Sequence, residues 1–448
     1  MTRELVLGIL LEVTRDGEYS HIALRNVLNK YQYLDKKDRA FITRVAEGTL
    51  EHMIEMDYII NQFSKVKVNK MKPVIRNILR SAVYQLKYMD SVPNSAACNE
   101  AVKLATKKGF SNLKGFVNGV LRNIERNLDH LTYPEETNLM EYLHVKYSVP
   151  EWILNQWLAK YDRNTVEEML KDFQKEKPTT IRCNLNQTSK EELIAELKAE
   201  GVQVEEHPYL PYALMISGYD YLGDLQSFQK GSFYVQDISS MLVAHIAAPK
   251  VGDTVVDVCA APGGKALHMA ELLKGTGNVE ARDLTDYKVN LIRENMIRSG
   301  MNNIEAVRWD ATVPDEQSVE KADIVVADLP CSGLGVLGKK TDLKYKMTEQ
   351  TQKELVKLQR DILSQVKRYV KTEGTLIYST CTIHEAENMG NVHWFLEENP
   401  GFELVSIEDR LYDGLKESVE KKGCLQLLPG IHESDGFFIA KFKKVKHG

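Results

Sequence analysis

The chain has 448 residues, 43% of them hydrophobic, which suffices for about two or three separate hydrophobic cores. No stretch approaches the roughly 18 uncharged apolar residues that cross a membrane. The charges of Arg3, Glu4 and Glu12 interrupt the first apolar run, as in an amphipathic helix and unlike a signal peptide. Six cysteines without paired spacing give no disulfide framework, and neither C-x-x-C nor clustered histidines indicate zinc. We therefore expect a cytoplasmic protein with reduced thiols, no membrane segment and no metal.

The net charge of −5 is unevenly distributed along the chain. Residues 1–135 hold 21 Lys and Arg against 15 Asp and Glu, whereas residues 136–230 hold 10 against 16 and residues 231–448 hold 27 against 32. An excess of positive charge at the N-terminal end is expected of a part that binds RNA phosphates. The alternative is a helical domain without that role, because this excess is small for a nucleic-acid-binding module.

The first 130 residues are predicted to be all-helical. Apolar residues recur at helical spacing in residues 3–14, 38–53, 56–63, 74–88, 94–107 and 113–128. Pro73 and Pro93 stand at helix starts, where the missing N–H costs nothing.

A second part follows a join marked by Pro134 and Pro150. After two further helices, residues 179–185 are predicted as a strand, 190–200 as a helix, and 202–206 and 213–216 as strands. This order indicates a small α+β module.

A Gly-rich turn follows the apolar strand that ends at Asp257. The turn comprises Cys259, Ala260, Ala261, Pro262, Gly263, Gly264 and Lys265, and residues 265–273 continue with helical spacing. Small residues let the backbone approach a bound nucleotide or amino-acid group, and the free N–H groups of the helix start face its charged parts. The pattern is neither the dinucleotide-binding G-x-G-x-x-G nor a P-loop.

Two acidic residues end the next predicted strands. Residues 278–282 lead to Asp283, where a carboxylate can accept from ribose hydroxyls, and residues 303–309 lead to Asp310, where one can accept from an adenine amine. Either residue alone could be an ordinary loop acid, since Asp favours turns. Together with the Gly-rich turn they predict an adenosine site.

Two cysteines also follow apolar strands. Residues 322–329 precede Cys331, with Asp328 three residues before the thiol, and residues 375–378 precede Cys381. Because parallel α/β sheets bind ligands at the carboxyl ends of their strands, both thiols should face one site. Free cysteines are usually buried as small hydrophobic residues, and this alternative holds for Cys98, Cys183 and Cys424.

The C-terminal half resembles the NOL1/NOP2/Sun family of S-adenosylmethionine-dependent RNA cytosine-5 methyltransferases, in particular the bacterial branch that acts on 16S rRNA. The matching segments are residues 236–240, 257–265, 328–335, 378–382, 428–430 and 435–438. The sequence departs from the family at Lys288, where many members have Arg, and at Thr382, where many have Ser. Neither departure affects the chemistry in an obvious way.

The resemblance implies three domains. Residues 1–132 would form a NusB-like helical RNA-binding domain, residues 133–230 linker helices and a small α+β, reduced RNA-recognition-like subdomain, and residues 231–448 a Rossmann-like α/β methyltransferase domain. Residues 78–86, 99–102 and 116–123 carry the NusB-type similarity. The lysine-rich residues 65–72 would contact phosphate in such a domain, or form a solvated loop.

The resemblance also implies S-adenosylmethionine as cofactor and 16S rRNA as partner, with cytosine 967 as target and a monomeric enzyme. Residues 259–265, Asp283, Asp310 and Asp328 would hold the cofactor. Carbon 5 of cytosine is a poor nucleophile, so a thiolate must first add at carbon 6 while Asp328 acts at ring nitrogen 3. Spacing does not decide which thiol attacks; by resemblance Cys381 attacks and Cys331 assists release. Lys265 either orients the site electrostatically or has a structural role.

Two other functions compete with this one. An amino-nitrogen methyltransferase would share the cofactor site, but its usual Pro-Pro-aromatic strand end is here replaced by Asp328-Leu329-Pro330-Cys331. A non-catalytic RNA-binding or transcription-elongation factor is suggested by the NusB-like half. Retention of both cysteines and the acidic residues argues against it, since a scaffold needs none of them.

Overall fold

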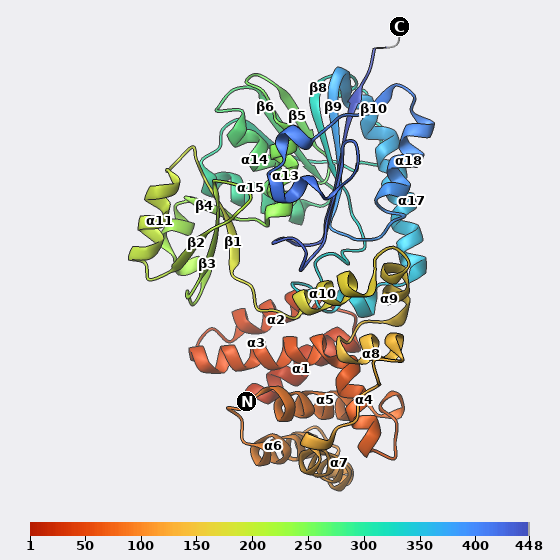
Figure 1. Ribbon diagram of the computed structural model, residues 1–448. Helices are drawn as coiled ribbons and strands as arrows, with labels where there is room; N and C mark the ends of the chain where they lie inside the picture. Colours follow the sequence, from red (N-terminus) through yellow and green to blue (C-terminus); the bar gives the residue numbers. More distant parts are fainter. Residues whose placement is uncertain (447–448) are drawn as a thin grey trace. The chain divides into compact units, whose positions relative to one another are not determined.

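The computed structural model describes residues 1–446, and its contacts divide the chain into two units. The helical unit comprises Met1–Gln174 and Leu337–Met347, and the sheet unit comprises Lys175–Val336 and the residues from Thr348 onward (Figure 1). The chain therefore leaves the sheet unit at Val336 and returns to it at Thr348.

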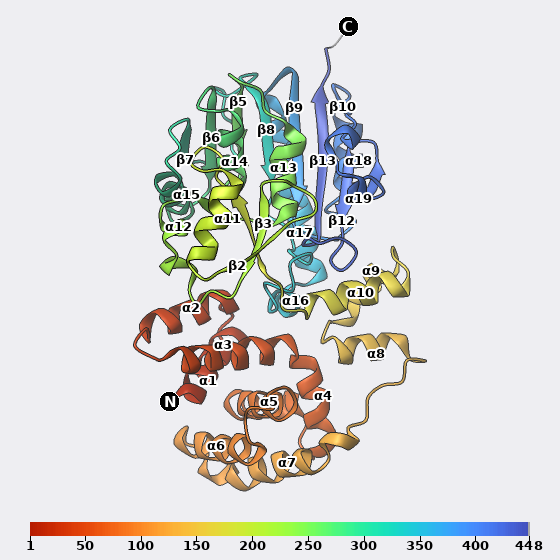
Figure 2. The ribbon, with the colours of Figure 1, turned by 60° about the vertical axis from the view of Figure 1, so that its left-hand side comes forward.

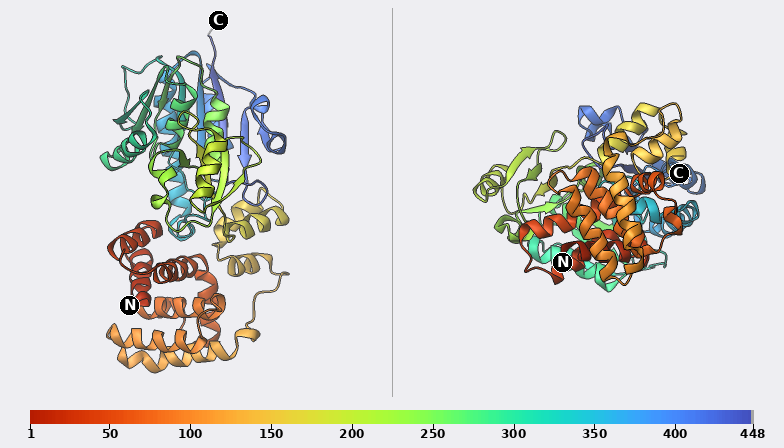
Figure 3. Two further views of the ribbon diagram at one scale, coloured as in Figure 1. Left: turned by 90° about the vertical axis from the view of Figure 1, so that its left-hand side faces the viewer. Right: turned by 90° about the horizontal axis from the view of Figure 1, so that it is seen from below.

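The helical unit contains eleven α-helices among the described residues: α1 Thr2–Thr14, α2 Ser20–Lys30, α3 Lys36–Glu51, α4 Met53–Phe63, α5 Pro73–Tyr88, α6 Asn94–Lys107, α7 Lys114–Arg126, α8 Leu139–Lys146, α9 Glu151–Leu158, α10 Arg163–Phe173 and α16 Leu343–Lys346. They stack in layers, with α6 and α7 side by side (Figure 3). Fully buried residues such as Leu10, Val45, Ile59 and Val83 form its core. The all-helical prediction for this part is confirmed.

Three helices of this unit were not predicted from the sequence: α2, α8 and α16, the last of which has only four residues. Helix α2 buries only Ser20, Ala23 and Leu24, so its apolar periodicity is weak. Helix α8 lies between Pro134 and Pro150, in the stretch that was predicted to be a join between domains. Both prolines stand outside the helix, so they do not interrupt its eight residues.

The segment Leu337–Met347 holds the ends of two helices in the helical unit. Asp342 accepts hydrogen bonds from the Ser20 backbone N at 3.1 Å and from its Oγ at 2.6 Å, at the N-terminus of α2. Lys344 Nζ donates to the carbonyl of Glu51, the last residue of α3, at 2.8 Å. Helix ends leave backbone groups without intrahelical partners, and this segment satisfies some of them.

The sheet unit begins with a small four-stranded antiparallel sheet in the order β2-β3-β1-β4. Its elements are β1 Thr179–Cys183, α11 Lys190–Ala199, β2 Gln203–Glu206, β3 Ala213–Ser217, α12 Gln226–Gln229 and β4 Phe233–Val235. The predicted β-α-β-β order is confirmed. The edge strand β4 was missed because it has only three residues.

A nine-stranded sheet follows, with the order β11-β12-β13-β9-β8-β5-β6-β7 and β10 paired to β13 (Figure 2). Its strands are β5 Thr254–Asp257, β6 Asn278–Asp283, β7 Ile304–Arg308, β8 Ala322–Asp328, β9 Val370–Thr380, β10 Phe402–Leu404, β11 Val419–Lys421, β12 Cys424–Leu427 and β13 Phe437–Lys444. Strands β5 to β9 pair in parallel, and the strands beyond β9 pair antiparallel. The carboxyl ends of the five parallel strands therefore share one edge of the sheet.

Helices cover both faces of this sheet. Its helices are α13 Ile238–Ala247, α14 Gly264–Leu272, α15 Asp286–Ser299, α17 Glu349–Val366, α18 Met389–Glu398 and α19 Asp413–Lys416. Alternate residues of one strand enter opposite cores: Val255 packs in the core with α13 and α14, whereas Val256 packs in the core with α17 and α18. Burial on both faces explains the continuous apolar runs in the sequence.

Candidate active site

The Gly-rich turn joins β5 to α14 at the carboxyl edge of the sheet. Gly263 has φ +108°, a conformation that glycine adopts readily and other residues avoid, and it immediately precedes the first helical residue, Gly264. The side chain of Asp283 accepts from the backbone N of Ala261 at 3.0 Å. The end of β6 thus holds the turn that begins after β5.

The two acidic residues predicted for adenosine differ in their surroundings. Asp283 is buried, and besides Ala261 it binds the Leu284 backbone N at 2.8 Å and Lys288 Nζ at 3.1 Å. Lys288 therefore contacts the predicted ribose-binding carboxylate, so this departure from the family lies at the site. Asp310 is exposed, and its Oδ1 accepts from the N and Oγ1 of Thr312 in its own turn.

Asp257 is a third acidic residue at the carboxyl edge of the sheet. Its side chain is fully buried at the end of β5, and neither oxygen has a hydrogen-bond partner. Burial, followed by the charge of Asp328, raises the pKa of Asp257 to about 7. A buried carboxylate of this kind favours a cationic partner, and the sulfonium and ammonium groups of S-adenosylmethionine fit that requirement.

The two predicted cysteines lie together. Cys331 follows β8 and Cys381 follows β9, and their Sγ atoms are 3.2 Å apart. The backbone N of Cys381 also donates to the Cys331 Sγ at 3.3 Å. The hydrogen bond with Cys381, followed by burial, raises the pKa of Cys331 well above its usual value. Both effects favour the protonated form of Cys331.

An ion pair joins the Gly-rich turn to the end of β8. Lys265 Nζ lies 2.8 Å from one carboxylate oxygen of Asp328, and Ser379 Oγ donates to the other at 2.8 Å. Burial opposes the charged form of Lys265, but Asp328 beside it raises the Lys265 pKa, and the charge of Cys381 acts in the same direction. A cation and a carboxylate therefore adjoin the thiol pair.

Two glycines bring the C-terminal strand region against the second cysteine. The backbone N of Gly335 donates to the Cys381 carbonyl at 3.1 Å, and that of Gly436 donates to the Gly335 carbonyl at 2.8 Å. A Cβ at Gly335 would lie only 2.0 Å from the Gly436 carbonyl oxygen. This close approach explains why the Asp435-Gly436-Phe437 segment belongs to the site.

Arg182 is a site residue that the sequence did not reveal. It lies on β1, is fully buried, and donates through Nη1 to the Gln236 side chain at 2.6 Å and to the Gly264 carbonyl at 3.1 Å. Glu271 of α14 lies 3.3 Å from its Nη2. A single arginine in a strand is typical of a solvent-facing position, so the burial of Arg182 could not be predicted from the sequence.

Glu387 and Asn388 were also missed. Both are fully buried just before α18, and their side chains bind residues next to Cys331 and Cys381. Thr382 Oγ1 lies 2.7 Å from Ser332 Oγ, so the second departure from the family retains a hydroxyl that lies between the two cysteine segments. A polar pair before an apolar helix resembles an ordinary helix cap, so Glu387 and Asn388 could not be recognised as site residues from the sequence.

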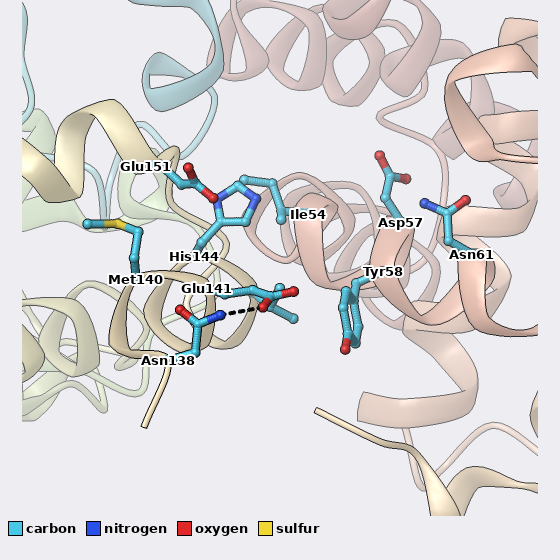
Figure 4. Close-up of a pocket in the computed structure, with 10 residues that line it drawn as sticks. Ile54, Asp57, Tyr58, Asn61, Asn138, Met140, Glu141, His144 and Glu151 are labelled. Atoms are coloured by element: carbon cyan, nitrogen blue, oxygen red, sulfur yellow. Dashed lines mark hydrogen bonds between the residues drawn. The ribbon is translucent and has the colours of Figure 1, made fainter. Parts of the chain in front are cut away.

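A hollow of about 690 Å³ lies in the helical unit, between α4 and α8 and near the start of α9 (Figure 4). Asp57, Glu141 and Glu151 are among its ten lining residues, none of which is Lys or Arg. Asp57 already pairs with Arg80 at 2.6 Å. Because negative charge repels phosphate, we do not assign this hollow to RNA.

Residues 1–446 were searched for clusters of metal ligands and for membrane-spanning helices. No group of three or more His, Cys, Asp or Glu side chains in this range could hold a metal ion. No helix in the same range is both long and apolar enough to cross a membrane.

Family comparisons agree with the three parts of the fold. Residues 244–443 match the family model of 16S rRNA methyltransferase RsmB/F, residues 1–126 match the NusB family, and residues 149–219 match the ferredoxin-like domain of RsmF/B-like methyltransferases. The predicted fold class is therefore confirmed: a NusB-like helical domain, a small α+β domain and an α/β methyltransferase domain.

Individual relatives match over almost the whole chain. The probable ribosomal RNA small subunit methyltransferase B of Bacillus subtilis (strain 168) is 36% identical over 448 residues, covering 99% of this chain and 98% of that protein. The ribosomal RNA small subunit methyltransferase B of Klebsiella pneumoniae (strain 342) is 29% identical over 444 residues, with 99% and 98% covered.

Solved structures share the fold. The crystal structure of PH0851 matches with a TM-score of 0.83 and 27% identity, and the match covers 99% of each chain. NSun6 from Pyrococcus horikoshii, solved with SFG, matches with a TM-score of 0.60 and 24% identity over 66% of this chain and 99% of that chain.

Proposed function

Because the chain belongs to the 16S rRNA methyltransferase RsmB/F family, we propose that it methylates carbon 5 of a cytosine in 16S rRNA, namely cytosine 967. Methyl transfer to small-subunit rRNA follows from the family, and the choice of atom and base is the proposal. Its main support is the thiol pair, with Sγ atoms 3.2 Å apart beside the ion pair of Lys265 and Asp328. An enzyme that methylates an amino nitrogen needs no thiol at this edge.

S-adenosylmethionine is the proposed methyl donor, and it supplies the methyl group to carbon 5. Residues 259–265 would face its amino-acid part, Asp283 its ribose and Asp310 its adenine. Asp257, buried without a hydrogen-bond partner, would offset the positive charge of the donor. Asp328 borders both this cofactor region and the thiols through its contact with Lys265.

Cys381 is the proposed nucleophile and Cys331 the residue that assists release. Cys331 holds its proton because the hydrogen bond with Cys381 and burial raise its pKa. Negative charge on Cys381 is favoured by the Lys265 ammonium, whose own pKa that charge raises. A thiolate at Cys381 and a thiol at Cys331 are the forms that attack and release require.

The chemical steps can be written with these groups. The Cys381 thiolate forms a bond to carbon 6, and the displaced electron pair moves toward ring nitrogen 3, which takes a proton from the Lys265–Asp328 pair through the Asp328 carboxyl group. Carbon 5 can then take the methyl group. Loss of the carbon-5 proton to a base returns an electron pair to the ring, which breaks the bond between sulfur and carbon 6. Cys331 assists this last step.

The remaining parts are proposed to serve RNA binding. The NusB-like residues 1–132 would bind phosphates, with the exposed Lys65, Lys67, Lys70 and Lys72 among the contacts. Domain boundaries at residues 132 and 230, a monomeric state and a cytoplasmic location complete the proposal. The target base must be unstacked to reach the thiols.

Mapping of 5-methylcytosine in 16S rRNA tests the function directly. Cells that lack the gene should lose the mark at cytosine 967, and wild-type protein should restore it whereas Cys381→Ala should not. A methyl group on the exocyclic nitrogen would instead support an amino-nitrogen methyltransferase. An unchanged mark in cells without the gene would refute the proposed target.

A further inference from the structure

Glu387 holds the first cysteine loop, defined as residues 329–334. Its Oε2 accepts from the backbone N of Ser332 at 2.9 Å, and its Oε1 accepts from the Ser332 Oγ at 2.5 Å. Gln359 Nε2 donates both to Glu387 Oε2 at 2.9 Å and to the Pro330 carbonyl at 2.8 Å. The residues before and after Cys331 are therefore both tied to this one carboxylate, directly or through Gln359.

Asn388 holds the second cysteine loop, defined as residues 380–384. Its Oδ1 accepts from Thr380 Oγ1 at 2.6 Å, and its Nδ2 donates to the Thr382 carbonyl at 3.0 Å. Nδ2 also donates to Gln426 Oε1 of β12 at 2.8 Å, which fixes the amide orientation. The residues on both sides of Cys381 thus bind one side chain.

The two loops are also joined to each other through these contacts. Ser332 Oγ, which donates to Glu387, lies 2.7 Å from Thr382 Oγ1. His384 Nδ1 lies 3.1 Å from Glu387 Oε1. Because Glu387 and Asn388 are consecutive and fully buried, a shift of either loop would break hydrogen bonds that water cannot replace.

We propose that Glu387 and Asn388 are positioning residues that set the placement of the two thiols: Glu387 acts on Cys331 and Asn388 acts on Cys381. Glu387 binds the backbone and hydroxyl of Ser332, and Asn388 binds Thr380 and Thr382, so each acts through groups that flank its cysteine. This inference rests on the proposed covalent mechanism, in which the two thiols act in different steps. Consecutive residues should therefore give different kinetic defects.

The experiment measures covalent adduct and product with 16S rRNA in single turnover. Asn388→Ala should slow adduct formation, on the order of 10²-fold, since displacement of a nucleophile by about 1 Å has that effect. Glu387→Ala should still form the adduct but release it slowly, as Cys331→Ala should, so that adduct accumulates on denaturing gels. Affinities for S-adenosylmethionine and RNA should stay within about threefold of wild type, because neither residue contacts a predicted ligand-binding residue.

Conservative variants separate positioning from loss of folding. In Glu387→Gln the amide oxygen can accept from the Ser332 N and Gln359, while its NH₂ group can donate to the Ser332 Oγ and to His384 Nδ1. This variant should restore release toward the wild-type rate. Thr380→Val removes only the hydroxyl that binds Asn388, so it should reproduce a milder form of the Asn388→Ala defect.

Asn399→Ala is the matched control. Asn399 is a buried amide that follows α18 and binds the Phe395 carbonyl at 2.7 Å, away from both loops. It should lower the thermal unfolding temperature without changing the adduct-to-product ratio. If Glu387→Ala and Asn388→Ala instead slow every step equally, as a destabilised fold would, the inference is overturned.

The two proposals fail in different ways. If Cys331→Ala accumulates adduct but Glu387→Ala does not, the positioning role of Glu387 is wrong and the covalent mechanism stands. If wild type methylates but Cys331→Ala and Cys381→Ala both leave no adduct and retain activity, the covalent mechanism is wrong, and the inference fails with it.

Discussion

In the proposed mechanism, two thiols at the carboxyl edge of the sheet act in different steps. Cys331 and Cys381 share a hydrogen bond, and this bond together with burial raises the pKa of Cys331. Lys265, paired with Asp328, favours negative charge on Cys381. The roles that the family resemblance implies are therefore consistent with local electrostatics.

Exchange of either cysteine for alanine should give opposite results. Cys381→Ala cannot form the bond to carbon 6 and should lose turnover altogether. Cys331→Ala should attack and methylate but release product poorly, so a protein–RNA complex should survive denaturing electrophoresis. The double variant should give no complex. A complex with Cys381→Ala alone would reverse the two roles.

Substitution of Asp283 tests the predicted contact between the protein and the cofactor ribose. Asp283→Ala should lower S-adenosylmethionine affinity by about 1 to 3 kcal/mol, because a buried ribose hydroxyl would lose its acceptor and the Ala261 N would lose its partner. Isothermal titration calorimetry measures this change. Asp286→Ala, an exposed carboxylate in the first turn of α15, should leave the affinity unchanged. Unchanged affinity in Asp283→Ala would remove the ribose role.

Asp257 should make stability depend on pH. Its pKa in the folded protein, about 7, lies above that of an unfolded Asp, near 3.9, so the folded state binds the extra proton between these values. Stability from this group is present below pH 4 and is lost as pH rises through 7. Asp257→Asn should therefore raise the unfolding temperature more at pH 8 than at pH 5. An equal change at both pH values would contradict the raised pKa.

Among the helices, α2 has its N-terminal cap supplied by the distant segment Leu337–Met347. Tyr19, the N-cap residue of α2, makes no side-chain cap, and Asp342 binds the backbone N of Ser20 instead. Burial opposes the charged form of Asp342, but hydrogen bonds from Ser20 and Lys346 hold its pKa below the usual value. A segment distant in sequence therefore completes the start of a helix.

Removal of this carboxylate should loosen α2. Asp342→Ala should cost about 0.5 to 2 kcal/mol, the range measured for helix N-caps, and hydrogen exchange should accelerate in α2 first. Asp129→Ala, an exposed carboxylate in the same unit, is the control and should have little effect. Because the pKa of Asp342 is lowered on folding, its stabilisation should be present at neutral pH and decline as pH falls toward that pKa.

For the whole molecule, the excess of positive charge in residues 1–135 should make RNA binding depend on salt concentration. Replacement of Lys65, Lys67, Lys70 and Lys72 by Gln should weaken binding and reduce the slope of log K against log salt by about 3. Deletion of residues 1–130 should reduce this slope further. The deletion would also remove residues that contact Leu337–Met347, so the lysine variant is the cleaner test. Cofactor affinity should be unchanged in the lysine variant, as calorimetry would show.

A control variant distinguishes phosphate binding by these four lysines from a general effect of the protein's net charge. Replacement of the exposed Lys353, Lys357, Lys421 and Lys422 by Gln removes the same number of charges from the sheet unit. If this variant lowers the salt slope as much as the first, the lysines of residues 65–72 have no special role, and they form only a solvated loop.

The helical and sheet parts, the strand ends and the family's motifs can be predicted from the amino-acid sequence alone. Periodicity revealed α5 and α6 because each buries a long apolar face, and continuous apolar runs revealed β8 and β9 because both faces of those strands are covered. Short or weakly apolar elements, such as α2 and β4, left too little pattern.

The polar residues around the two thiols can be recognised only in the folded chain. Arg182, Glu387 and Asn388 are ordinary polar residues in sequence, and tertiary contacts join them to distant partners: Gly264 for Arg182, Ser332 for Glu387 and Gln426 for Asn388. The 3.2 Å between Cys331 and Cys381 likewise follows from the parallel pairing of β8 with β9. Local pattern encodes burial and periodicity, whereas these contacts join residues 38 to 82 positions apart and form only when the chain folds.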